Sequence, residues 1–536
     1  MSVAVQDRTF DVLIVGAGVA GLYALHRMRT LGLRAKVLEA GAGIGGTWYW
    51  NRYPGARCDI ESLDYSYSFS EAIQQEWEWS ERYAAQPDIL RYIKHVASTL
   101  DLHRDIVLNT RVEKLEYDAS ARQWTLTTAK ERMVARFVIM ATGCLSIPLD
   151  VAIPGIESFE GKVYRTSNWP HGPVDFHDLR VGLIGTGSSG VQVAPILARD
   201  ASHLTVFQRT PNYSIPSHNR TLEAEFIKQW KADYSARRKA ARQTRNFTNN
   251  DAGTAPGCDQ TFEQREHEFE RRWRETGGIG FMYAFPDMTT DATVNEHASD
   301  FVRRKIREIV KDQEVANLLC PRDYGIGGKR ICVDTGYFEI FNRANVKLVD
   351  LKTDPIVRVT ATGIMTQTRE FALDALVLAL GFDAMTGALL RVDIRGREGI
   401  SLRERWKEGP RTYLGIAVAG FPNLFIVTGP GSPSVFANMV TSVEQHVDWI
   451  ADCMSRMRER GDTCIEATVK AEADWFAHVA EVGARTMLAK AANSWYVGAN
   501  VPGKPRVVMP YMGGAPQYEE ICNRVAAENY EGFIRA

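Results

Sequence analysis

Two glycine-rich turns constrain the fold of this chain more than any other feature of its sequence. Residues 16–21 read G-A-G-V-A-G and residues 185–190 read G-T-G-S-S-G, and each turn follows a short apolar run and opens a helix-like segment. Glycine is needed in such a turn because the backbone bends tightly and approaches a pyrophosphate held at the helix N-terminus. The two turns therefore predict an α/β protein with two doubly wound, Rossmann-like dinucleotide-binding domains.

The end of the next strand indicates which nucleotide each turn binds. After the first turn that strand ends at Glu39, whose carboxylate suits ribose hydroxyls. After the second turn it ends at Gln208, Arg209 and Thr210, where a guanidinium suits a 2′-phosphate. We therefore expect an unphosphorylated dinucleotide such as FAD at the first turn and NADPH at the second.

Composition and charge exclude several classes of protein. The 536 residues are enough for two or three domains, and a formal net charge of −1 provides no general attraction to nucleic acid or to an acidic membrane. Residues 1–7 contain no basic region followed by an apolar stretch, and apolar runs such as residues 375–380 are only strand-sized. We expect a soluble cytoplasmic protein without nucleic-acid or membrane partners; the sequence does not indicate its oligomeric state.

The cysteines point away from disulfide and metal chemistry. The eight cysteines are scattered and form no CxxC pair. This pattern argues against a disulfide framework and against a cysteine zinc site, so no metal is expected. It also argues against a flavin-dependent disulfide reductase, because that class needs a redox-active cysteine pair beside the flavin.

Changes in composition divide the chain into segments. We expect residues 1–147 to form the first part of the FAD domain, and residues 148–213 to form a linker and the first part of the NADP domain. Residues 214–320 contain amphipathic helical patterns and predict a helical insertion. The NADP domain should resume at residues 321–381, and residues 382–536 should complete the FAD domain with a C-terminal segment.

Two further segments are dense in aromatic residues, glycine and charge. Residues 45–59 read G-G-T-W-Y-W-N-R-Y-P-G-A-R-C-D, a poor composition for a helix or a strand. Aromatic rings pack on flat heterocycles, and Arg57 and Asp59 would place opposite charges beside such a group. The other segment, residues 159–170, reads F-E-G-K-V-Y-R-T-S-N-W-P and lies on the expected linker between the domains.

With these motifs the chain resembles the type I Baeyer–Villiger monooxygenases over nearly its whole length. G-G-x-W at residues 45–48, with Y-P-G at 53–55 and Asp59, looks like one family signature. Phe159-x-Gly161 with W-P at 169–170 looks like the other, F-x-G-x-x-x-H-x-x-x-W-[P/D]. Residues 327–330 and 494–503 agree as well. The S-P-S sequence at 432–434, followed by Val435 and Phe436, is most similar to the phenylacetone and steroid monooxygenase branch.

The resemblance implies an enzyme that inserts one oxygen atom of O2 next to the carbonyl of a ketone, giving an ester or a lactone. NADPH would reduce FAD, and the reduced flavin would form a C4a-peroxide with O2. The peroxide must stay anionic to attack the carbonyl, so a permanently charged donor is needed beside it. Arg330 matches the family's catalytic arginine and Asp59 matches its carboxylate partner; the alternative is that both are ordinary surface charges.

Matching to the family also assigns binding residues. Those expected at FAD are Gly16, Gly18, Gly21, Glu39, Gly46, Thr47, Trp48, Tyr49, Trp50, Asp59, Tyr65, Val112 and Met439. Those expected at NADP are Arg57, Gly185, Thr186, Gly187, Ser188, Ser189, Gly190, Arg209, Thr210, Lys329, Arg330 and Trp495. The expected substrate wall, which suits a small hydrophobic ketone, consists of Ile60, Cys144, Leu145, Ile331, Val435 and Phe436. For Trp495, burial in the core is the alternative.

Two positions depart from the family pattern. Arg165 stands where the fingerprint has histidine, and Leu380 stands within the usual Ala-Thr-Gly of the last domain crossing. We expect Arg165 to lie at the domain junction, outside the reacting shell, in an active enzyme. We expect Leu380 to affect only the backbone where the chain crosses between the domains, and not the chemistry.

Two other functions are open at this point. A flavin monooxygenase that oxidises nitrogen or sulfur uses a protonated hydroperoxide and does not need Arg330 at the flavin. An NADPH oxidase or a redox-sensing flavoprotein would bind both nucleotides without oxygenating a substrate.

Overall fold

The first glycine turn follows strand β1 of a mixed sheet. The computed structural model describes residues 8–491 and 494–536, and the strand order of this sheet is β17-β4-β5-β6-β1-β2-β3, with β18 beside β6. Parallel pairing joins β3, β2, β1, β6 and β18, whereas β4, β5 and β6 form an antiparallel meander. The strands are β1 (Arg8–Val15), β2 (Ala35–Leu38), β3 (Ile106–Val107), β4 (Val112–Asp118), β5 (Gln123–Thr128), β6 (Arg132–Met140), β17 (Asp393–Arg395) and β18 (Leu424–Ile426).

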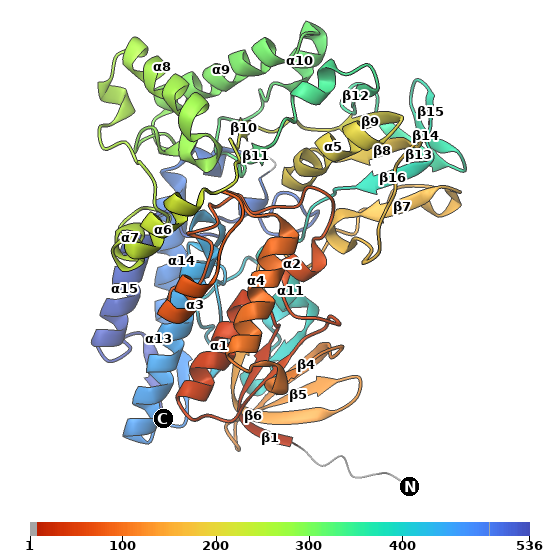
Figure 1. Ribbon diagram of the computed structural model, residues 1–536. Helices are drawn as coiled ribbons and strands as arrows, with labels where there is room; N and C mark the ends of the chain where they lie inside the picture. Colours follow the sequence, from red (N-terminus) through yellow and green to blue (C-terminus); the bar gives the residue numbers. More distant parts are fainter. Residues whose placement is uncertain (1–7, 492–493) are drawn as a thin grey trace.

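The alternation of side chains along β1 explains how this sheet is covered. Val12 and Ile14 belong to the large core beneath the helices, whereas Leu13 and Val15 belong to a second core shared with the meander. Both faces of the strand are buried, so its sequence is a continuous apolar run. The helices that lie together along this domain are α1 (Val19–Thr30), α4 (Gln86–Thr99) and α13 (Met439–Arg460) (Figure 1).

A second, fully parallel sheet carries the second glycine turn. Its order is β12-β9-β8-β16-β7. Its strands are β7 (Lys162–Arg165), β8 (Arg180–Ile184), β9 (His203–Gln208), β12 (Val346–Asp350) and β16 (Ala375–Leu378), and α5 (Ser188–Asp200) follows β8. The small antiparallel sheet beside it consists of β13 (Ile356–Thr360), β14 (Gly363–Thr366) and β15 (Glu370–Ala372).

The edge strand β7 corrects one expectation. The segment around Arg165 was expected to be a linker, but β7 pairs in parallel with β16, with Arg165 opposite Leu378. The short sequence K-V-Y-R at 162–165 has a strand pattern that the surrounding glycine and proline residues hide. Arg165 therefore belongs to the second domain itself.

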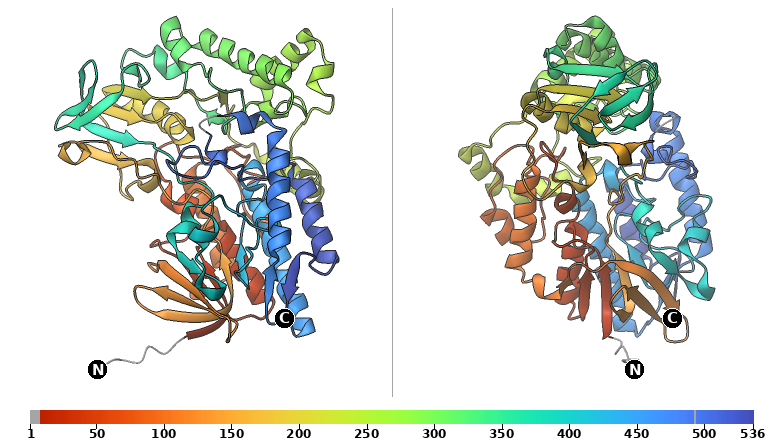
Figure 2. Two further views of the ribbon diagram at one scale, coloured as in Figure 1. Left: turned by 180° about the vertical axis from the view of Figure 1, so that it is seen from behind. Right: turned by 90° about the vertical axis from the view of Figure 1, so that its right-hand side faces the viewer.

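The helical insertion lies between β9 and β12, and its part from residue 262 to 319 is at the end of the molecule opposite the meander (Figure 2). Its helices are α6 (Ala224–Ala232), α7 (Tyr234–Ala241), α8 (Phe262–Arg271), α9 (Ala292–Ile309) and α10 (Gln313–Leu319). Its ends are joined because β10 (Ser214–Pro216) pairs with β11 (Cys332–Asp334). The chain returns to the parallel sheet only at β12, later than the boundary at residue 321 expected from composition.

Two crossing segments connect the domains and run antiparallel to each other. Leu149 N donates to Gly381 O at 3.0 Å, and Met385 N donates to Cys144 O at 2.8 Å. Gly381 has φ +86°, which explains the glycine beside Leu380. The remaining helices are α2 (Thr47–Trp50), α3 (Glu71–Glu76), α11 (Gly387–Arg391), α12 (Leu402–Arg405), α14 (Val469–Ala484) and α15 (Ala515–Ala527), and β19 (Ile465–Ala467) pairs with β20 (Phe533–Arg535). No helix in the described parts of the chain is long and apolar enough to cross a membrane.

Candidate active site

The first glycine turn has the geometry of a dinucleotide site. A Cβ atom on Gly21 would lie 1.8 Å from the carbonyl oxygen of Gly16, so a larger residue does not fit there. Glu39, which follows β2, is 6% exposed and accepts hydrogen bonds from Ala17 N at 2.8 Å and Gly41 N at 2.7 Å. The carboxylate is thereby held at the turn with remaining lone pairs for ribose hydroxyls, so the residues present fit FAD.

The first aromatic segment, residues 45–59, packs directly on this turn. Contrary to the expectation from composition, residues 47–50 form the single helical turn α2, with Gly46 at its N-cap. A Cβ atom on Gly46 would lie 2.8 Å from the Cα atom of Gly18, so the two backbones need glycine to pass this closely. Trp48 Nε1 donates to the hydroxyl of Tyr65 at 3.2 Å. The expected FAD residues of this segment therefore lie beside the turn, whereas Val112 packs in the core shared with the meander.

The second turn leaves open space where a phosphate group binds in this fold. A Cβ atom on Gly187 would meet no atom within 4 Å. Thr186 Oγ1 donates to the carbonyl of Thr210 at 2.9 Å, which ties the turn to the end of β9. Ser188 is the first residue of α5, so the helix N-terminus points its amide groups into this space.

Two cations lie beside the second turn without an acidic partner among the described residues. Neither Arg209, which is exposed, nor the half-buried Lys329 forms an ion pair with a carboxylate in the described part of the chain. Burial lowers the pKa of Lys329, and the positive charge of Arg209 lowers it further. The positive charges of Arg209 and Lys329 repel each other, and an anion bound between them would offset this repulsion. The site therefore fits the 2′-phosphate of NADPH.

Arg57 and Gln192 connect the aromatic segment to α5. Arg57 was expected at NADP, and its guanidinium Nη1 lies 2.6 Å from Glu81 Oε2 and 2.6 Å from the carbonyl of Tyr83. Gln192 accepts a hydrogen bond from the hydroxyl of Tyr53 at 2.8 Å and donates to the Arg57 carbonyl at 3.1 Å. No sequence pattern pointed to Gln192, because it is an ordinary polar residue inside a helix.

Arg330 and Asp59, expected as the catalytic pair, form an ion pair. They are 271 residues apart in sequence, and Arg330 Nε donates to Asp59 Oδ2 at 2.9 Å. Arg330 Nη1 also donates to the carbonyl of Val435 at 3.0 Å. Burial lowers the pKa of Arg330, but the charge and hydrogen bond of Asp59 outweigh burial and leave that pKa above its ordinary value. The guanidinium is therefore a fixed and permanently charged donor.

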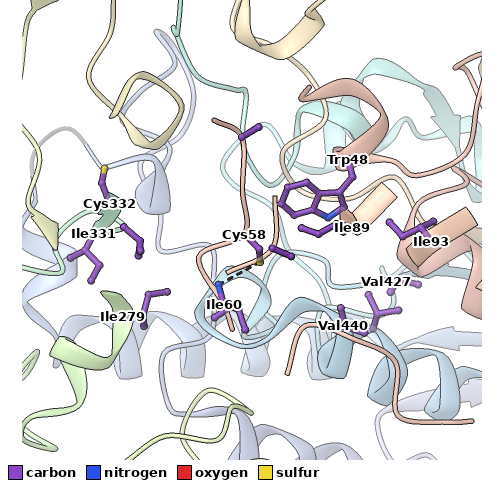
Figure 3. Packing of buried hydrophobic residues seen from close by; sticks show 14 of the residues in the cluster. Trp48, Cys58, Ile60, Ile89, Ile93, Ile279, Ile331, Cys332, Val427 and Val440 are labelled. Carbon is purple, nitrogen blue, oxygen red and sulfur yellow. Dashed lines mark hydrogen bonds between the residues drawn. The ribbon is translucent and has the colours of Figure 1, made fainter. Parts of the chain in front are cut away.

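The residues of the expected substrate wall belong to more than one apolar cluster. Ile60 and Ile331 follow Asp59 and Arg330 directly and belong to one apolar cluster, with Ile60 N donating to Cys58 Sγ at 3.4 Å (Figure 3). A separate cluster contains five residues expected at the substrate or a cofactor: Cys144, Leu145, Val435, Met439 and Trp495. Trp495, which was expected at NADP, is half-buried in this cluster. The hydrogen bond from Arg330 to the Val435 carbonyl links the second cluster to the ion pair between Arg330 and Asp59.

Comparisons with known proteins agree along the full chain. A curated acetone monooxygenase (methyl acetate-forming) from Gordonia sp. (strain TY-5) is 40% identical over 530 residues, covering 98% of this chain and 99% of that protein. A Baeyer–Villiger monooxygenase from Pseudooceanicola batsensis is 39% identical over 530 residues, covering 98% and 96%. The solved structure of an oxidized steroid monooxygenase bound to NADP superimposes with a TM-score of 0.95 at 48% identity, covering 98% and 99%.

Two other matches bear on the alternatives. The phenazine N-monooxygenase PhzNO1 of Lysobacter antibioticus is 39% identical over 534 residues, covering 99% of this chain and 98% of that protein. The family model of pyridine nucleotide-disulphide oxidoreductases matches residues 13–244. That match covers both glycine turns, while the cysteines of the chain are all free. The chain therefore shares with that family the segment that contains both glycine turns, and its sequence has no CxxC pair.

Proposed function

This chain belongs to the type I Baeyer–Villiger monooxygenases, and we propose that Arg330, oriented by Asp59, is the cation at which its oxygen insertion takes place. The enzyme uses FAD and NADPH to insert one oxygen atom of O2 next to a ketone carbonyl, giving an ester or a lactone. FAD reduced by NADPH supplies the activation of O2 when it is bound. The ion pair between Arg330 and Asp59 is the observation that carries the proposal.

In this proposal, separate groups of residues bind FAD, bind NADPH and stabilise the charge that develops in the reaction. Glu39 and the first turn hold FAD, and the second turn with Arg209 and Lys329 holds NADPH. Asp59 and the Val435 carbonyl fix two donor atoms of Arg330, so its remaining N–H groups are aimed at the negative charge that develops during oxygen insertion. Because this charge is already in place, no reorganisation is needed at the moment of reaction.

The substrate in this proposal is a small hydrophobic ketone. The wall contains Ile60 and Ile331 from one apolar cluster and Cys144, Leu145 and Val435 from another, all of them without charge. A ketone with apolar flanks gains from burial there, and its carbonyl is the one polar group to be matched. Action in the cytoplasm, without nucleic-acid or membrane partners, stays a prediction from the sequence.

The ratio of product to NADPH tests the proposed function. A panel of apolar ketones should give close to one ester or lactone per NADPH consumed, measured by mass spectrometry and by absorbance at the nicotinamide band. The same assay should include an aromatic N-heterocycle, because the phenazine N-monooxygenase relative makes nitrogen oxidation the second candidate. N-oxide without ester would establish that alternative, and hydrogen peroxide alone would indicate an oxidase.

Replacing Arg165 by histidine restores the fingerprint residue and should keep the enzyme active. Arg165 is half-buried on the edge strand β7, opposite Leu378, and its side chain has no hydrogen-bond or ion-pair partner in the described structure. Most substitutions at such positions change stability little. We expect unchanged or higher coupling of NADPH use to ester formation, measured as product per NADPH together with the flavin reduction rate. A wild type without ketone oxygenation beside an active histidine variant would show that Arg165 inactivates the enzyme.

A further inference from the structure

A tyrosine near Arg330 has a hydroxyl group that no group in the described residues binds. Tyr496 lies in the short helix η11 (Trp495–Val497) and is 1% exposed. Within the described residues its phenol oxygen has no hydrogen-bond partner. Its ring is buried, but the oxygen is not among the fully buried side-chain atoms that lack a partner, so it retains some accessible surface. A ligand that supplies an acceptor can therefore reach this hydroxyl group.

The ring of Tyr496 is held rigidly in the substrate wall. Its centroid lies 4.5 Å from that of Phe436 and 4.3 Å from that of Trp495. Phe436 follows Val435, whose carbonyl accepts the hydrogen bond from Arg330. Tyr496 thus packs on the same segment that positions the guanidinium. Two aromatic neighbours fix the direction of its hydroxyl group.

The electrostatic surroundings make this hydroxyl a donor. Burial raises the pKa of Tyr496, the charge of Arg330 lowers it, and the net pKa lies above its ordinary value. The phenol therefore stays protonated at any working pH and can donate a hydrogen bond, but it cannot act as a base. Arg330 also offers only donors. An acceptor oxygen placed between the two groups would therefore satisfy both.

We propose that the Tyr496 hydroxyl donates a hydrogen bond to the carbonyl oxygen of the ketone substrate and so orients that carbonyl beside Arg330. The proposal rests on the proposed function. A ketone oxygen has two lone pairs, and among the groups of an apolar ketone it is the only acceptor. Fixing its direction also fixes which face of the carbonyl is attacked and which neighbouring carbon migrates. Tyr496 is therefore a determinant of orientation as well as of binding.

The test is the variant Tyr496→Phe, which removes the hydroxyl and retains the ring. We expect kcat/KM for ketones to fall about 10- to 100-fold, the range for leaving a buried acceptor unpaired. The KM for NADPH and the rate of NADPH oxidation without ketone should stay unchanged, and hydrogen peroxide per NADPH should rise. Titration of the oxidised holoenzyme with a ketone in a calorimeter should show a Kd raised about 5- to 10-fold, independently of turnover.

Tyr511→Phe is the matched control. Tyr511 is also 1% exposed, its ring stacks on Trp475 at 5.4 Å, and its hydroxyl is likewise unpartnered in the described structure. Its pKa is affected by burial and Cys522, not by Arg330. Equal losses in Tyr496→Phe and Tyr511→Phe would show a structural effect and overturn the proposal.

Two further outcomes would also overturn it. An increased KM for NADPH with unchanged ketone kinetics would make the nucleotide the partner of Tyr496. A loss confined to Tyr283→Phe would assign the role to Tyr283, the half-buried tyrosine of η6 (Gly278–Tyr283) whose pKa also responds to Arg330. In either case the proposed function is retained if the wild type makes ester. If the wild type makes no ester, the proposed function itself is refuted, and the role of Tyr496 falls with it.

Discussion

Arg330→Ala should abolish ester formation while the protein still binds FAD. The variant loses the charge that is held by both Asp59 and the Val435 carbonyl, and the negative charge developing on the substrate is left without a fixed cation. Removing one preorganised donor of this kind typically costs about 100- to 1,000-fold in kcat. Ester should be measured by mass spectrometry, with flavin absorbance reporting FAD content. NADPH consumption with hydrogen peroxide release is compatible with the expected result.

Two variants serve as comparisons for Arg330→Ala. Asp59→Ala should reduce ester formation less completely, because the guanidinium keeps its charge and its bond to Val435 but loses its orientation. Arg322→Ala removes an exposed arginine from the same segment and should behave as the wild type. Wild-type rates of ester formation in Arg330→Ala would show that Arg330 is not the catalytic arginine.

Arg209→Ala should remove most of the preference for NADPH over NADH. Arg209 and Lys329 place two positive charges beside the second turn, and each charge-assisted contact with a phosphate contributes about 1.5–3 kcal/mol. We expect the KM for NADPH to rise about 10- to 100-fold, while the KM for NADH stays nearly unchanged because NADH has no 2′-phosphate. Steady-state kinetics with both nucleotides measures the effect.

The control for this prediction is Arg199→Ala. Arg199 is an exposed arginine near the end of α5 that pairs with Asp200, far along the helix from the glycine turn. Its replacement should change neither KM. Equal use of NADPH and NADH by the wild type would refute the assignment of Arg209 and Lys329 to the 2′-phosphate.

The two-domain scaffold and its nucleotides were predictable from adjacent residues. A tight glycine turn is a local steric requirement: a Cβ atom at Gly21 or Gly190 would clash with the carbonyl oxygen of the first glycine in the same turn, at 1.8 Å and 2.1 Å. The residue at the end of the next strand, Glu39 after the first turn and Arg209 after the second, is also close to its turn in sequence and indicates which nucleotide binds. Constraints of this short range leave a pattern of neighbouring residue types, and such a pattern is visible in the amino-acid sequence.

The pairing of Arg330 with Asp59 was expected only through the family resemblance. Across 271 residues, no pattern in the sequence brings two side chains together. The pairing depends on the return of the chain through β10 and β11 and on the crossing segments between the domains. The bond from Arg330 to the Val435 carbonyl was not foreseen, because a backbone carbonyl leaves no mark in the sequence.

The way in which the domains are joined depends on long-range packing. Composition predicted a linker around Arg165, yet pairing with β16 makes the segment an edge strand, because a few residues adopt a strand when a partner offers hydrogen bonds. Long-range packing also determines the role of Gln192, whose side-chain amide joins residues 45–59 to α5. The same is true of Tyr496, because the sequence does not indicate that its hydroxyl lacks a partner among the described residues. These features depend on which distant groups meet, and packing of the whole chain decides that.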